Sequence, residues 1–575
     1  MKGLCLSIRV SEADQTGEIS THWIEDVVQR VLDRNVDRYV ISSGKSPSGS
    51  IHIGIMRELI ICDVIRRRLR ALGKQAVTLF VVDDLDPLRS LPPDVPLRLD
   101  EWAGIPYCDV PDPFGCCESF GRHWTNELVA TFPDFGIRPR VIWTSELYRN
   151  RRMLREVRTC LRNTEVIREI MIEYVARDFD SEQRAEYVRS MQDWYPVSVI
   201  CPKCNHIQSG VKGSIQPNRV SSYDPETDMV SYECSHCGHS DTGPLGALRV
   251  KLGWRVDWPA KWHLLNVTCE PAGKDHAVKG GSYDTGLEIS RRVFGWQGPV
   301  KVPYEWVQIG GRDMATSEGI VFTPKAWLEI APPQVYRYLM LKTDLQRTVN
   351  IQPELIPDLV DRYDHLEMVY YGLESSDADM TNIVRIIYPL SEVGPVRKRI
   401  VPKLSFKFAL LMSQLENIIG HDLMLQRSME SIKKRYGVRR LSRTAQALVL
   451  SRLSQALRWV QQYGSERDLV RVTESVPDDV LSSLSDVDVK FLSVLADSLR
   501  TPGLSDGEIQ SLVFQAARSV GVPERRGFAV IYMVLISRNS GPRIGPFINM
   551  LGTDWVLKRL EQVILARGGG RATTN

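Results

Sequence analysis

The stretch RYVISSGKSPSGSIHIG, residues 38–54, decides how the surrounding chain is organised. Its opening, RYVIS, is rich in β-branched and aromatic residues and ends in small ones, which predicts a buried strand. Pro47 and Gly49 then prevent a strand or a helix from continuing. A helix is expected next, with an apolar side and a basic, wet side. The apolar positions are Ile61, Ile65, Leu69 and Leu72, and the basic ones are Arg66, Arg67, Arg68 and Arg70.

A strand, a glycine-containing turn and a helix together form a cradle for an anion. Backbone N–H groups of the turn and of the helix N-terminus point at the oxygens of a bound phosphate. Gly54 leaves bare backbone against which a base or a ribose can lie, and His52 can donate to a phosphate oxygen. A simpler interpretation also fits, in which the turn has no ligand and His52 only packs.

The composition is that of a globular protein with several domains. A chain of 575 residues has room for three or four domains, and 43% hydrophobic with 25% charged residues is typical of folded proteins. The net charge of +3 restricts any nucleic-acid contact to local patches. The first residues lack the apolar run of a signal peptide, and no apolar run approaches the roughly 18 residues of a membrane span. We therefore expect a soluble, cytoplasmic protein without membrane contact, and a monomer.

A second buried strand is expected after the helix. The segment QAVTLFVVDD is apolar almost throughout, as a strand of a parallel sheet covered on both faces must be. It ends in Asp83 and Asp84, with Asp86 close behind. Ligands of doubly wound sheets bind at the carboxyl ends of strands, so these acids are placed for a substrate amine or a ribose. Helix capping is the alternative, and it stays open above all for Asp86.

Two cysteine pairs predict a metal site. The pairs are CPKC, with Cys201 and Cys204, and CSHC, with Cys234 and Cys237. Two residues between thiolates let both sulfurs face one ion, and two such knuckles close a four-sulfur zinc site that is structural because it has no open position. Three nearby histidines could replace one ligand: His206, His236 and His239. The segment between the knuckles is polar and is expected to be poor in strands. The other seven of the 11 cysteines, including the adjacent Cys116 and Cys117, fit reduced thiols of a cytosol.

These segments resemble those of a known family. PSGSIHIG is similar to the His-Ile-Gly-His signature of class I aminoacyl-tRNA synthetases, in the Pro-Ser-Gly context of the class I lysyl enzymes. DDLDPLRSLPPDVP, VPDPFGCCESF and EPAGKDHAVKGGSYDTG resemble further segments of those enzymes, and the likeness continues to GPRIGPF and DWVLKRL near the end. The resemblance implies an α/β Rossmann catalytic domain with a zinc-binding insert, followed by an all-α C-terminal bundle or cage.

The resemblance also implies a division of the site between two substrates. ATP, with Mg²⁺, would contact Pro47, Ser48, Gly49, His52, Gly54, Gly273, Asp275, Met314, Thr316 and Ser317. The amino acid would contact the family's pocket positions and the two acids that end the second strand, namely Gly44, Ser46 (commonly Thr), Trp254, His276, Tyr304, Asp83 and Asp84. The catalytic set would be His52, Gly54, His276, Met314 and Ser317. Aromatic walls suit a side-chain stem, although Trp254 taken alone also fits a core position.

One motif departs from the family. The ATP loop of the lysyl enzymes reads Lys-Met-Ser-small-Ser-Lys-Gly, and here residues 313–319 read DMATSEG. Asp313 and Glu318 stand where lysines would stabilise the pyrophosphate leaving group, and losing one such donor costs about 3 kcal/mol. Ile55 replaces the polar residue that usually ends the first signature. We therefore expect adenylate formation to be slower than with both lysines.

Helical patterns dominate from about Lys342 onward. Basic clusters at 397–399 and 433–435 could contact an RNA backbone or could simply be solvated helix ends. The predicted domains are the first half of the catalytic domain (1–120), a helical connecting insert (121–197), a zinc-binding module (198–248), the second half of the catalytic domain with the ATP loop (249–341), an α-helical domain like those that bind tRNA or anticodons (342–565) and a disordered tail (566–575).

The function implied by the resemblance is that of an AMP-forming ligase. Such an enzyme activates an amino acid with ATP and transfers it to an acceptor, here lysine to tRNA. The altered loop and Ile55 favour an alternative, a biosynthetic paralogue that forms an amide bond with a small-molecule amine without tRNA. A non-catalytic binder of tRNA or nucleotide is a third hypothesis, against which the retained pocket residues argue. The sequence names neither the amino acid nor the acceptor.

Overall fold

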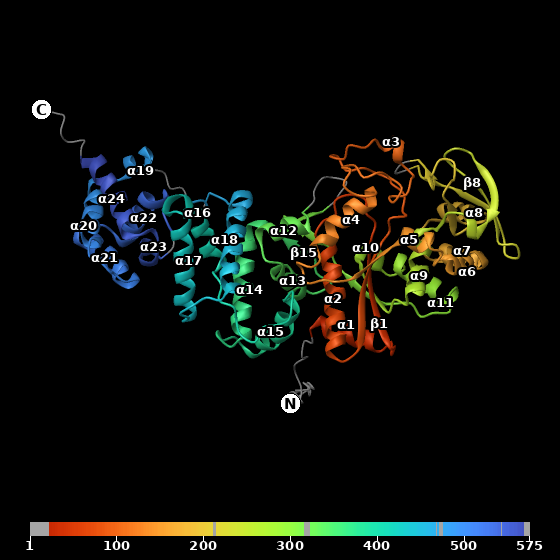
Figure 1. Cartoon of the computed structure of the whole chain (residues 1–575), viewed down its shortest axis with the longest axis horizontal. Coiled ribbons are helices and arrows are strands. Elements are labelled where there is room, and N and C mark those ends of the chain that lie inside the picture. Colours follow the sequence, from red (N-terminus) through yellow and green to blue (C-terminus); the bar gives the residue numbers. More distant parts are fainter. Residues whose placement is uncertain are drawn as a thin grey trace. The chain divides into compact units, whose positions relative to one another are not determined.

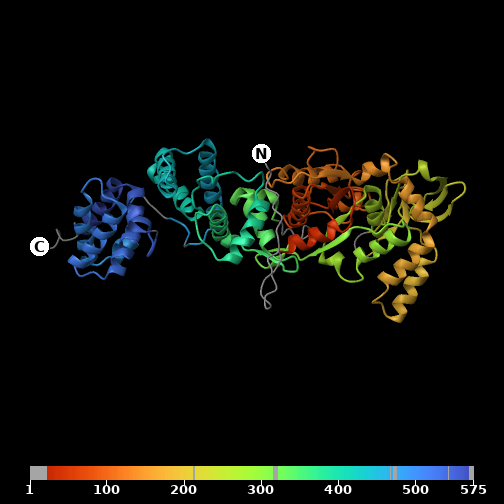
Figure 2. The same ribbon diagram turned by 90° about the horizontal axis from the view of Figure 1, so that it is seen from below.

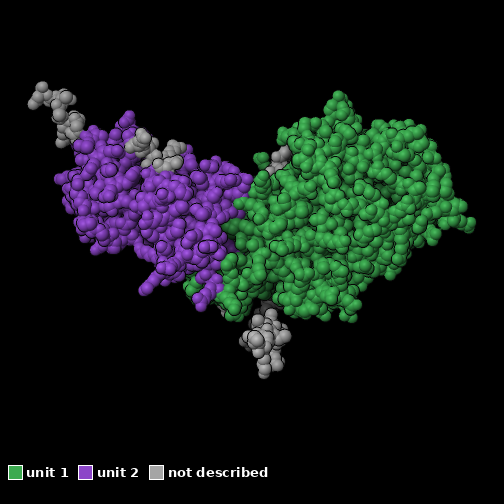
Figure 3. Space-filling model, viewed as in Figure 1, with its two compact units in different colours: residues 1–328, 332–353, 366–398 green, residues 329–331, 354–365, 399–575 purple. Residues whose placement is uncertain are grey.

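The computed structural model describes residues 22–210, 214–314, 322–466, 468–470, 475–541 and 543–568. The chain forms two compact units, which Figure 3 colours separately. Unit 1 contains residues 1–328, 332–353 and 366–398, and unit 2 contains residues 329–331, 354–365 and 399–575. Residues 366–398, which we expected in the C-terminal domain, therefore belong with the catalytic part.

A five-stranded parallel sheet forms the centre of unit 1 (Figure 1). Its strands, in spatial order, are β12 (Val300–Tyr304), β11 (Cys269–Gly273), β1 (Arg38–Lys45), β2 (Gln75–Val82) and β3 (Arg140–Trp143). The chain builds β1, β2 and β3 outward in one direction and then adds β11 and β12 on the other side of β1. This doubly wound order confirms the predicted Rossmann-like core, and it puts the switch point between β1 and β11.

Helices α1 (Trp23–Leu32) and α2 (Ile55–Ala71) pack against each other beside this sheet. The expected wet side of α2 is largely covered, because its arginines form ion pairs there. Arg66 and Arg67 pair with the buried Asp63 at 2.7 and 2.8 Å, and Arg68 pairs with Glu25 of α1 at 2.7 Å. Arginines on a helix are therefore covered where a carboxylate of the same helix, such as Asp63, or of a neighbouring helix, such as Glu25, pairs with them.

The predicted helical insert, residues 121–197, also contains a strand. Its helices are α4 (Phe120–Thr131), α5 (Thr144–Arg149), α6 (Leu154–Arg162), α7 (Thr164–Val175) and α8 (Ser181–Met191). Between α4 and α5 runs β3, which pairs in parallel with β2 at the edge of the central sheet. Four residues are too few for a clear two-residue periodicity, so the helical patterns around β3 hid it. Figure 2 shows α7 and α8, in gold, standing away from the sheet.

The segment that holds the two cysteine pairs contains more strand than we expected. Its strands are β4 (Val197–Val199), β5 (Gln208–Ser209), β6 (Gln216–Pro217), β7 (Arg219–Asp224), β8 (Met229–Glu233) and β9 (Ser240–Pro244). The last three form an antiparallel sheet whose exposed, polar residues lack a regular alternation with apolar ones. The chain does not join the main sheet at residues 248–262 either. There β10 (Val250–Leu252) pairs with β4, and α9 (Trp254–Leu265) follows, so the main sheet resumes only at β11.

A small three-stranded sheet carries the start of the ATP loop. Its order is β14-β13-β15, where β13 (Val307–Ile309) pairs antiparallel with β14 (Arg312–Asp313) and parallel with β15 (Val349–Ile351). The remaining helices before residue 399 are α3 (Leu99–Trp102), α10 (Lys274–Ala277), α11 (Ser282–Arg292), α12 (Pro324–Ile330), α13 (Pro333–Lys342), α14 (Ile356–Tyr370) and α15 (Ala378–Ser391). The end of α12 and the first part of α14 belong to unit 2.

The described residues of unit 2 from 399 onward form helices, as predicted. They are α16 (Phe406–Ile419), α17 (His421–Tyr436), α18 (Arg443–Tyr463), α19 (Asp478–Ser483), α20 (Asp486–Leu499), α21 (Asp506–Ser519), α22 (Glu524–Ile536), α23 (Ile544–Leu551) and α24 (Thr553–Gly568). Helix α24 continues past the predicted start of the tail at 566, and residues 569–575 lie outside the described chain. Among the described helices none is long and apolar enough to cross a membrane.

Candidate active site

A cavity of about 690 Å³ opens at the carboxyl ends of β1, β2, β11 and β12, at the switch point of the sheet. The sequence-predicted residues that line it are Gly44, Ser46, Ser48, His52, Gly54, Asp83, Trp254, Gly273, Asp275, His276, Tyr304 and Met314. The predicted residues Pro47, Gly49 and Asp84 do not line it, and Thr316 and Ser317 lie outside the described residues. The segments far apart in sequence therefore meet at one site, although the role of each residue stays a prediction.

The cradle turn between β1 and α2 fixes the orientation of His52. Gly49 has φ 154°, which residues with a side chain rarely adopt. The backbone N–H of Gly54 donates to His52 Nδ1 at 3.2 Å, so the neutral ring carries its proton on Nε2. Burial, reinforced by the positive charge of Lys45, lowers the pKa of His52 to about 4. His52 is thus a neutral donor near pH 7.

Gly54 is required by the ring of His52 rather than by its own backbone. Its φ of −53° is ordinary for a helix start. A Cβ added to Gly54 would lie 2.7 Å from His52 Nδ1, closer than real contacts allow, and 3.6 Å from the terminal methyl of Met314. The two motifs of the sequence, the first signature and the ATP loop, therefore meet at this glycine.

His276 forms part of an aromatic wall. Its Nδ1 lies 2.9 Å from Ser282 Oγ, and its ring is packed edge-on against Trp254 and Trp258, with centroids 5.8 and 5.5 Å away. Trp254 is 42% exposed and lines the cavity, so the core position that its sequence context also allowed is excluded. Asp275, from the same short helix α10, accepts a hydrogen bond from Trp306 Nε1 at 3.2 Å.

Two buried glutamates that we did not identify from the sequence also line the cavity. Glu58 accepts hydrogen bonds from the Gly44 N–H at 3.3 Å and from the Tyr304 hydroxyl at 2.5 Å, and burial raises its pKa to about 8. Glu270 accepts from the indole N–H groups of Trp258 and Trp262 at 2.6 and 2.9 Å, and burial raises its pKa to about 7. For Glu58 a signal existed, because it stands one helical turn after Gly54 and so shares its face.

A network of charges forms another part of the lining. Lys251 lies 2.9 Å from Asp86 and 3.6 Å from Asp257, and Lys261 lies 2.9 Å from Asp257 and pairs also with Asp83. Burial opposes the ionisation of Asp257, but Lys261 and Lys251 outweigh it and hold the pKa of Asp257 below its usual value. Three carboxylates with two ammonium groups leave one negative charge, which suits a cationic ligand.

The three acids that follow β2 have different partners. Asp83 accepts from the Thr144 hydroxyl at 2.9 Å, and Asp86 accepts from the Ser46 hydroxyl at 2.7 Å, so both lie among cavity residues. Asp84 instead accepts from the N–H of Ser145 at 2.8 Å and from its hydroxyl at 2.5 Å. For Asp84 the structure favours the capping alternative. Asp86, for which capping had stayed open above all, lines the cavity.

The start of the ATP loop reaches the cavity. Asp313 accepts a hydrogen bond from Gln308 Nε2 at 2.8 Å across the β13–β14 hairpin and is exposed. Met314 is buried beside Gly54. Residues 315–321 lie outside the described chain. An acid therefore lines the cavity where the related motif has a lysine.

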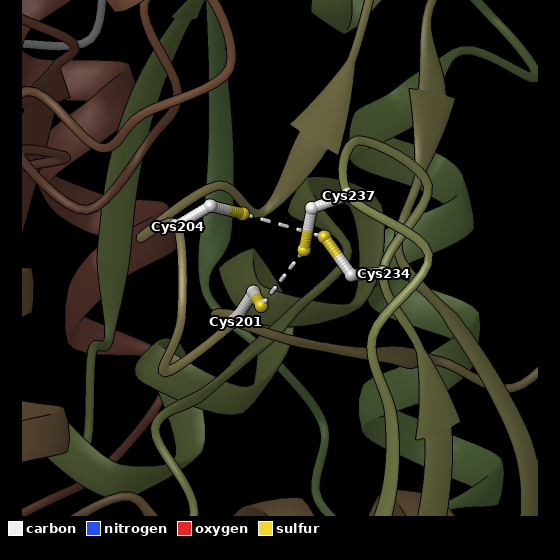
Figure 4. Close-up of side chains that lie close together, drawn as sticks. All are labelled: Cys201, Cys204, Cys234 and Cys237. Atoms are coloured by element: carbon white, nitrogen blue, oxygen red, sulfur yellow. Dashed lines mark hydrogen bonds between the residues drawn. The ribbon is translucent and has the colours of Figure 1, made fainter.

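The four predicted cysteines lie together in Figure 4. Cys201 Sγ is 3.7 Å from Cys237 Sγ, Cys204 Sγ is 3.5 Å from Cys234 Sγ, and all four sulfurs lie within 4.8 Å of one another. Tetrahedral zinc with bonds of about 2.3 Å separates its sulfurs by about 3.8 Å, so this donor set fits the ion. His206 and His236 instead stack on each other, with ring centroids 3.6 Å apart.

A second group that could hold a metal ion was missed in the sequence. Asp112, Cys116, Cys117 and His123 place one ligand atom each within 4.8 Å of the others. The Asp112 carboxylate accepts the backbone N–H groups of Cys116 and Cys117, both at 2.6 Å, and His123 Nδ1 lies 3.3 Å from Cys116 Sγ. From the sequence we grouped Cys116 and Cys117 with the reduced thiols. His123, which follows them closely in the sequence, was the signal that could have revealed the group.

The doubly wound sheet, the phosphate-type cradle and the cavity at the switch point define a nucleotide-binding α/β protein. Residues 21–392 match the family model of the tRNA synthetases class I (K), and the chain belongs to this family. A lysine–tRNA ligase of Methanocaldococcus jannaschii is 31% identical over 550 residues, covering 94% of this chain and 99% of that protein. One of Archaeoglobus fulgidus is 32% identical over 547 residues, covering 94% and 100%.

Proposed function

We propose that this protein is a lysine–tRNA ligase, which activates lysine with ATP and transfers it to tRNA. The observation that carries the proposal is the likeness to the archaeal lysine–tRNA ligases, because it spans 94% of this chain and nearly all of theirs. A match of that extent includes the C-terminal helices as well as the catalytic core. It favours tRNA as acceptor over the small-molecule amine that the altered loop had suggested.

The charges of the cavity support lysine as the substrate. Its lining includes seven Asp or Glu residues but four Lys or Arg residues. Glu58 is mostly protonated and Glu270 about half protonated near pH 7, and the five aspartates of the lining still outnumber its four cations. A second ammonium group on the amino acid is stabilised by such surroundings.

We propose the following arrangement of substrates. His52 and Gly54 hold the phosphates of MgATP, and Gly273 with Asp275 hold its ribose. Lysine lies against Trp254, His276 and Tyr304, with Gly44, Ser46 and Asp83 fixing its polar ends. A carboxylate oxygen of lysine attacks the α-phosphorus, the bond from that phosphorus to the bridging oxygen breaks, and pyrophosphate leaves with the bonding electron pair. The adenylate then passes its lysyl group to the terminal ribose of tRNA.

We also propose one structural zinc ion on the four cysteines of the two knuckles. The sulfur separations and the absence of an open position support this assignment over a catalytic one. The second group, around Asp112, would hold a further ion of the same kind.

Exchange of labelled pyrophosphate into ATP, measured with each of the 20 amino acids and with or without tRNA, tests the proposal. We expect exchange to depend on lysine and labelled lysine to appear on tRNA, and we expect His52→Ala to reduce exchange about a hundredfold. Turnover with another amino acid, or transfer to an amine without tRNA, would replace the proposal by the paralogue. No turnover under any condition, with His52→Ala indistinguishable, would mean that the protein is not an enzyme.

A further inference from the structure

Lys45 is the last residue of β1 and lines the cavity. Its position is fixed by the sheet, because Lys45 pairs with Val82 and its carbonyl accepts the N–H of Asp83 at 3.0 Å. Its ammonium group forms no hydrogen bond or ion pair with any residue that the structure describes. A rigid strand therefore presents this cation at the switch point without a partner.

The surroundings of Lys45 are the residues proposed to hold the reacting groups. Lys45 lines the same cavity as His52 and His276, and its positive charge contributes to lowering both pKa values, after burial for His52 and after burial and Arg255 for His276. Burial lowers the pKa of Lys45, and the acid whose attraction opposes this lowering is Glu58. Glu58, however, is already bonded to Gly44 and Tyr304 and is mostly neutral near pH 7. Lys45 thus has no ionised counter-charge there.

The other cations of the cavity differ from Lys45. Lys251 and Lys261 are neutralised by the aspartates of the charge network. Arg89 also lacks a partner among the described residues, but it is exposed to solvent. Lys45 is partly buried, and a partly buried ammonium group without a counter-ion costs free energy, which an anionic ligand restores. Lys45 is therefore the unsatisfied cation inside the cavity.

We infer that Lys45 binds the α-phosphate of ATP and stabilises the negative charge that grows on its non-bridging oxygens as the lysine carboxylate attacks. The inference rests on the proposed function. During this step the new bond joins a carboxylate oxygen to the α-phosphorus, and the bond to the pyrophosphate oxygen breaks. Lys45 keeps its proton throughout and acts as a hydrogen-bond donor. Its position on β1 supplies a fixed cation to the reaction, whereas the sequence of the ATP loop has Asp313 and Glu318 in place of lysines.

Lys45→Met tests the inference, with Lys45→Arg as the variant that keeps the charge. Met replaces an unpaired ammonium group by an apolar side chain of similar length, so folding should be retained, and Lys45→Gln is the second neutral variant. Lys74→Met is the matched control, because Lys74 is exposed and precedes β2 at the opposite, amino end of the sheet.

Two measurements separate the possible outcomes. By calorimetry, Lys45→Met should weaken MgATP binding about tenfold or more while leaving adenosine binding unchanged, and in pyrophosphate exchange its kcat should fall about a hundredfold. Lys45→Arg should recover a large part of both, and Lys74→Met should match the wild type. Unchanged MgATP binding and exchange in Lys45→Met would refute the role of Lys45 while leaving the ligase intact. If Lys45→Met weakened the binding of adenosine and of MgATP equally, Lys45 would have a structural role, which would also refute the inference. A wild type that binds no MgATP would refute the proposed function, and this inference with it.

Discussion

Replacing Glu58 by glutamine should make the stability of unit 1 less sensitive to alkaline pH than that of the wild type. Glu58 is buried and its pKa is raised from 4.5 to about 8 by that burial. The native state therefore binds a proton that the unfolded chain releases at much lower pH. The stability associated with this proton is complete below the unfolded pKa and is lost as pH rises through the folded value. The glutamine side chain of the variant stays neutral at every pH, and its carbonyl oxygen can accept from the Gly44 N–H while its NH2 group donates to the Tyr304 hydroxyl oxygen.

The size of the effect follows from the two pKa values. With a folded pKa of about 8, proton linkage costs the wild type about 2 kcal/mol more at pH 8 than at pH 6. Glu270, whose pKa is about 7, adds a pH dependence of the same sign in both proteins, so it cancels in the comparison. Glu58→Gln should therefore gain about 2 kcal/mol on the wild type between these two pH values.

Urea unfolding followed by tryptophan fluorescence measures this difference. All tryptophans except Trp459 and Trp555 lie in unit 1, so the signal reports mainly on the unit that contains Glu58. Glu127→Gln, on the exposed surface of α4, is the control and should show no such gain. Parallel pH dependences for Glu58→Gln and the wild type would refute the reasoning, because Glu58 would then be ionised in the folded protein.

The two other predictions concern the metal and the cradle. Freshly purified protein should contain one zinc ion per chain, or two if the Asp112 group also holds one. Cys201→Ser should lose the ion of the two knuckles and unfold the segment that holds them, because such an ion contributes on the order of 10 kcal/mol to folding. Metal-free wild type with four freely titratable thiols would contradict this. Gly54→Ala should displace the His52 ring and reduce pyrophosphate exchange at least tenfold with little loss of stability. Gly394→Ala is the control and should leave exchange unchanged, because its added Cβ meets no atom within 4 Å. Full activity in Gly54→Ala would mean that the ring position does not matter.

Features fixed by residues close together in the chain could be predicted from the sequence. The strand, turn and helix of the cradle follow from β-branched residues, Pro47, Gly49 and a helical repeat, and all three elements are where these signals put them. Each cysteine knuckle is equally local and was predicted, whereas the strands between the two knuckles bring all four sulfurs together. The strands that the sequence did not reveal include β3, which is too short to show a period, and β7 and β9, whose exposed polar residues do not alternate regularly with apolar ones.

Only the tertiary structure decided which charged groups of the site are paired. Lys45 stands inside the stretch from which the fold was predicted, yet its lack of a counter-ion depends on α2, where Glu58 is turned toward Tyr304 of β12. Lys251 is neutralised instead, because β10 pairs with β4 and brings it to Asp86. The periodicity of a segment reports its own exposure, whereas the free energy of a buried charge depends on every group packed against it. The sequence therefore determined the cradle and the two cysteine knuckles, and the packing of distant elements determined the electrostatics of the cavity.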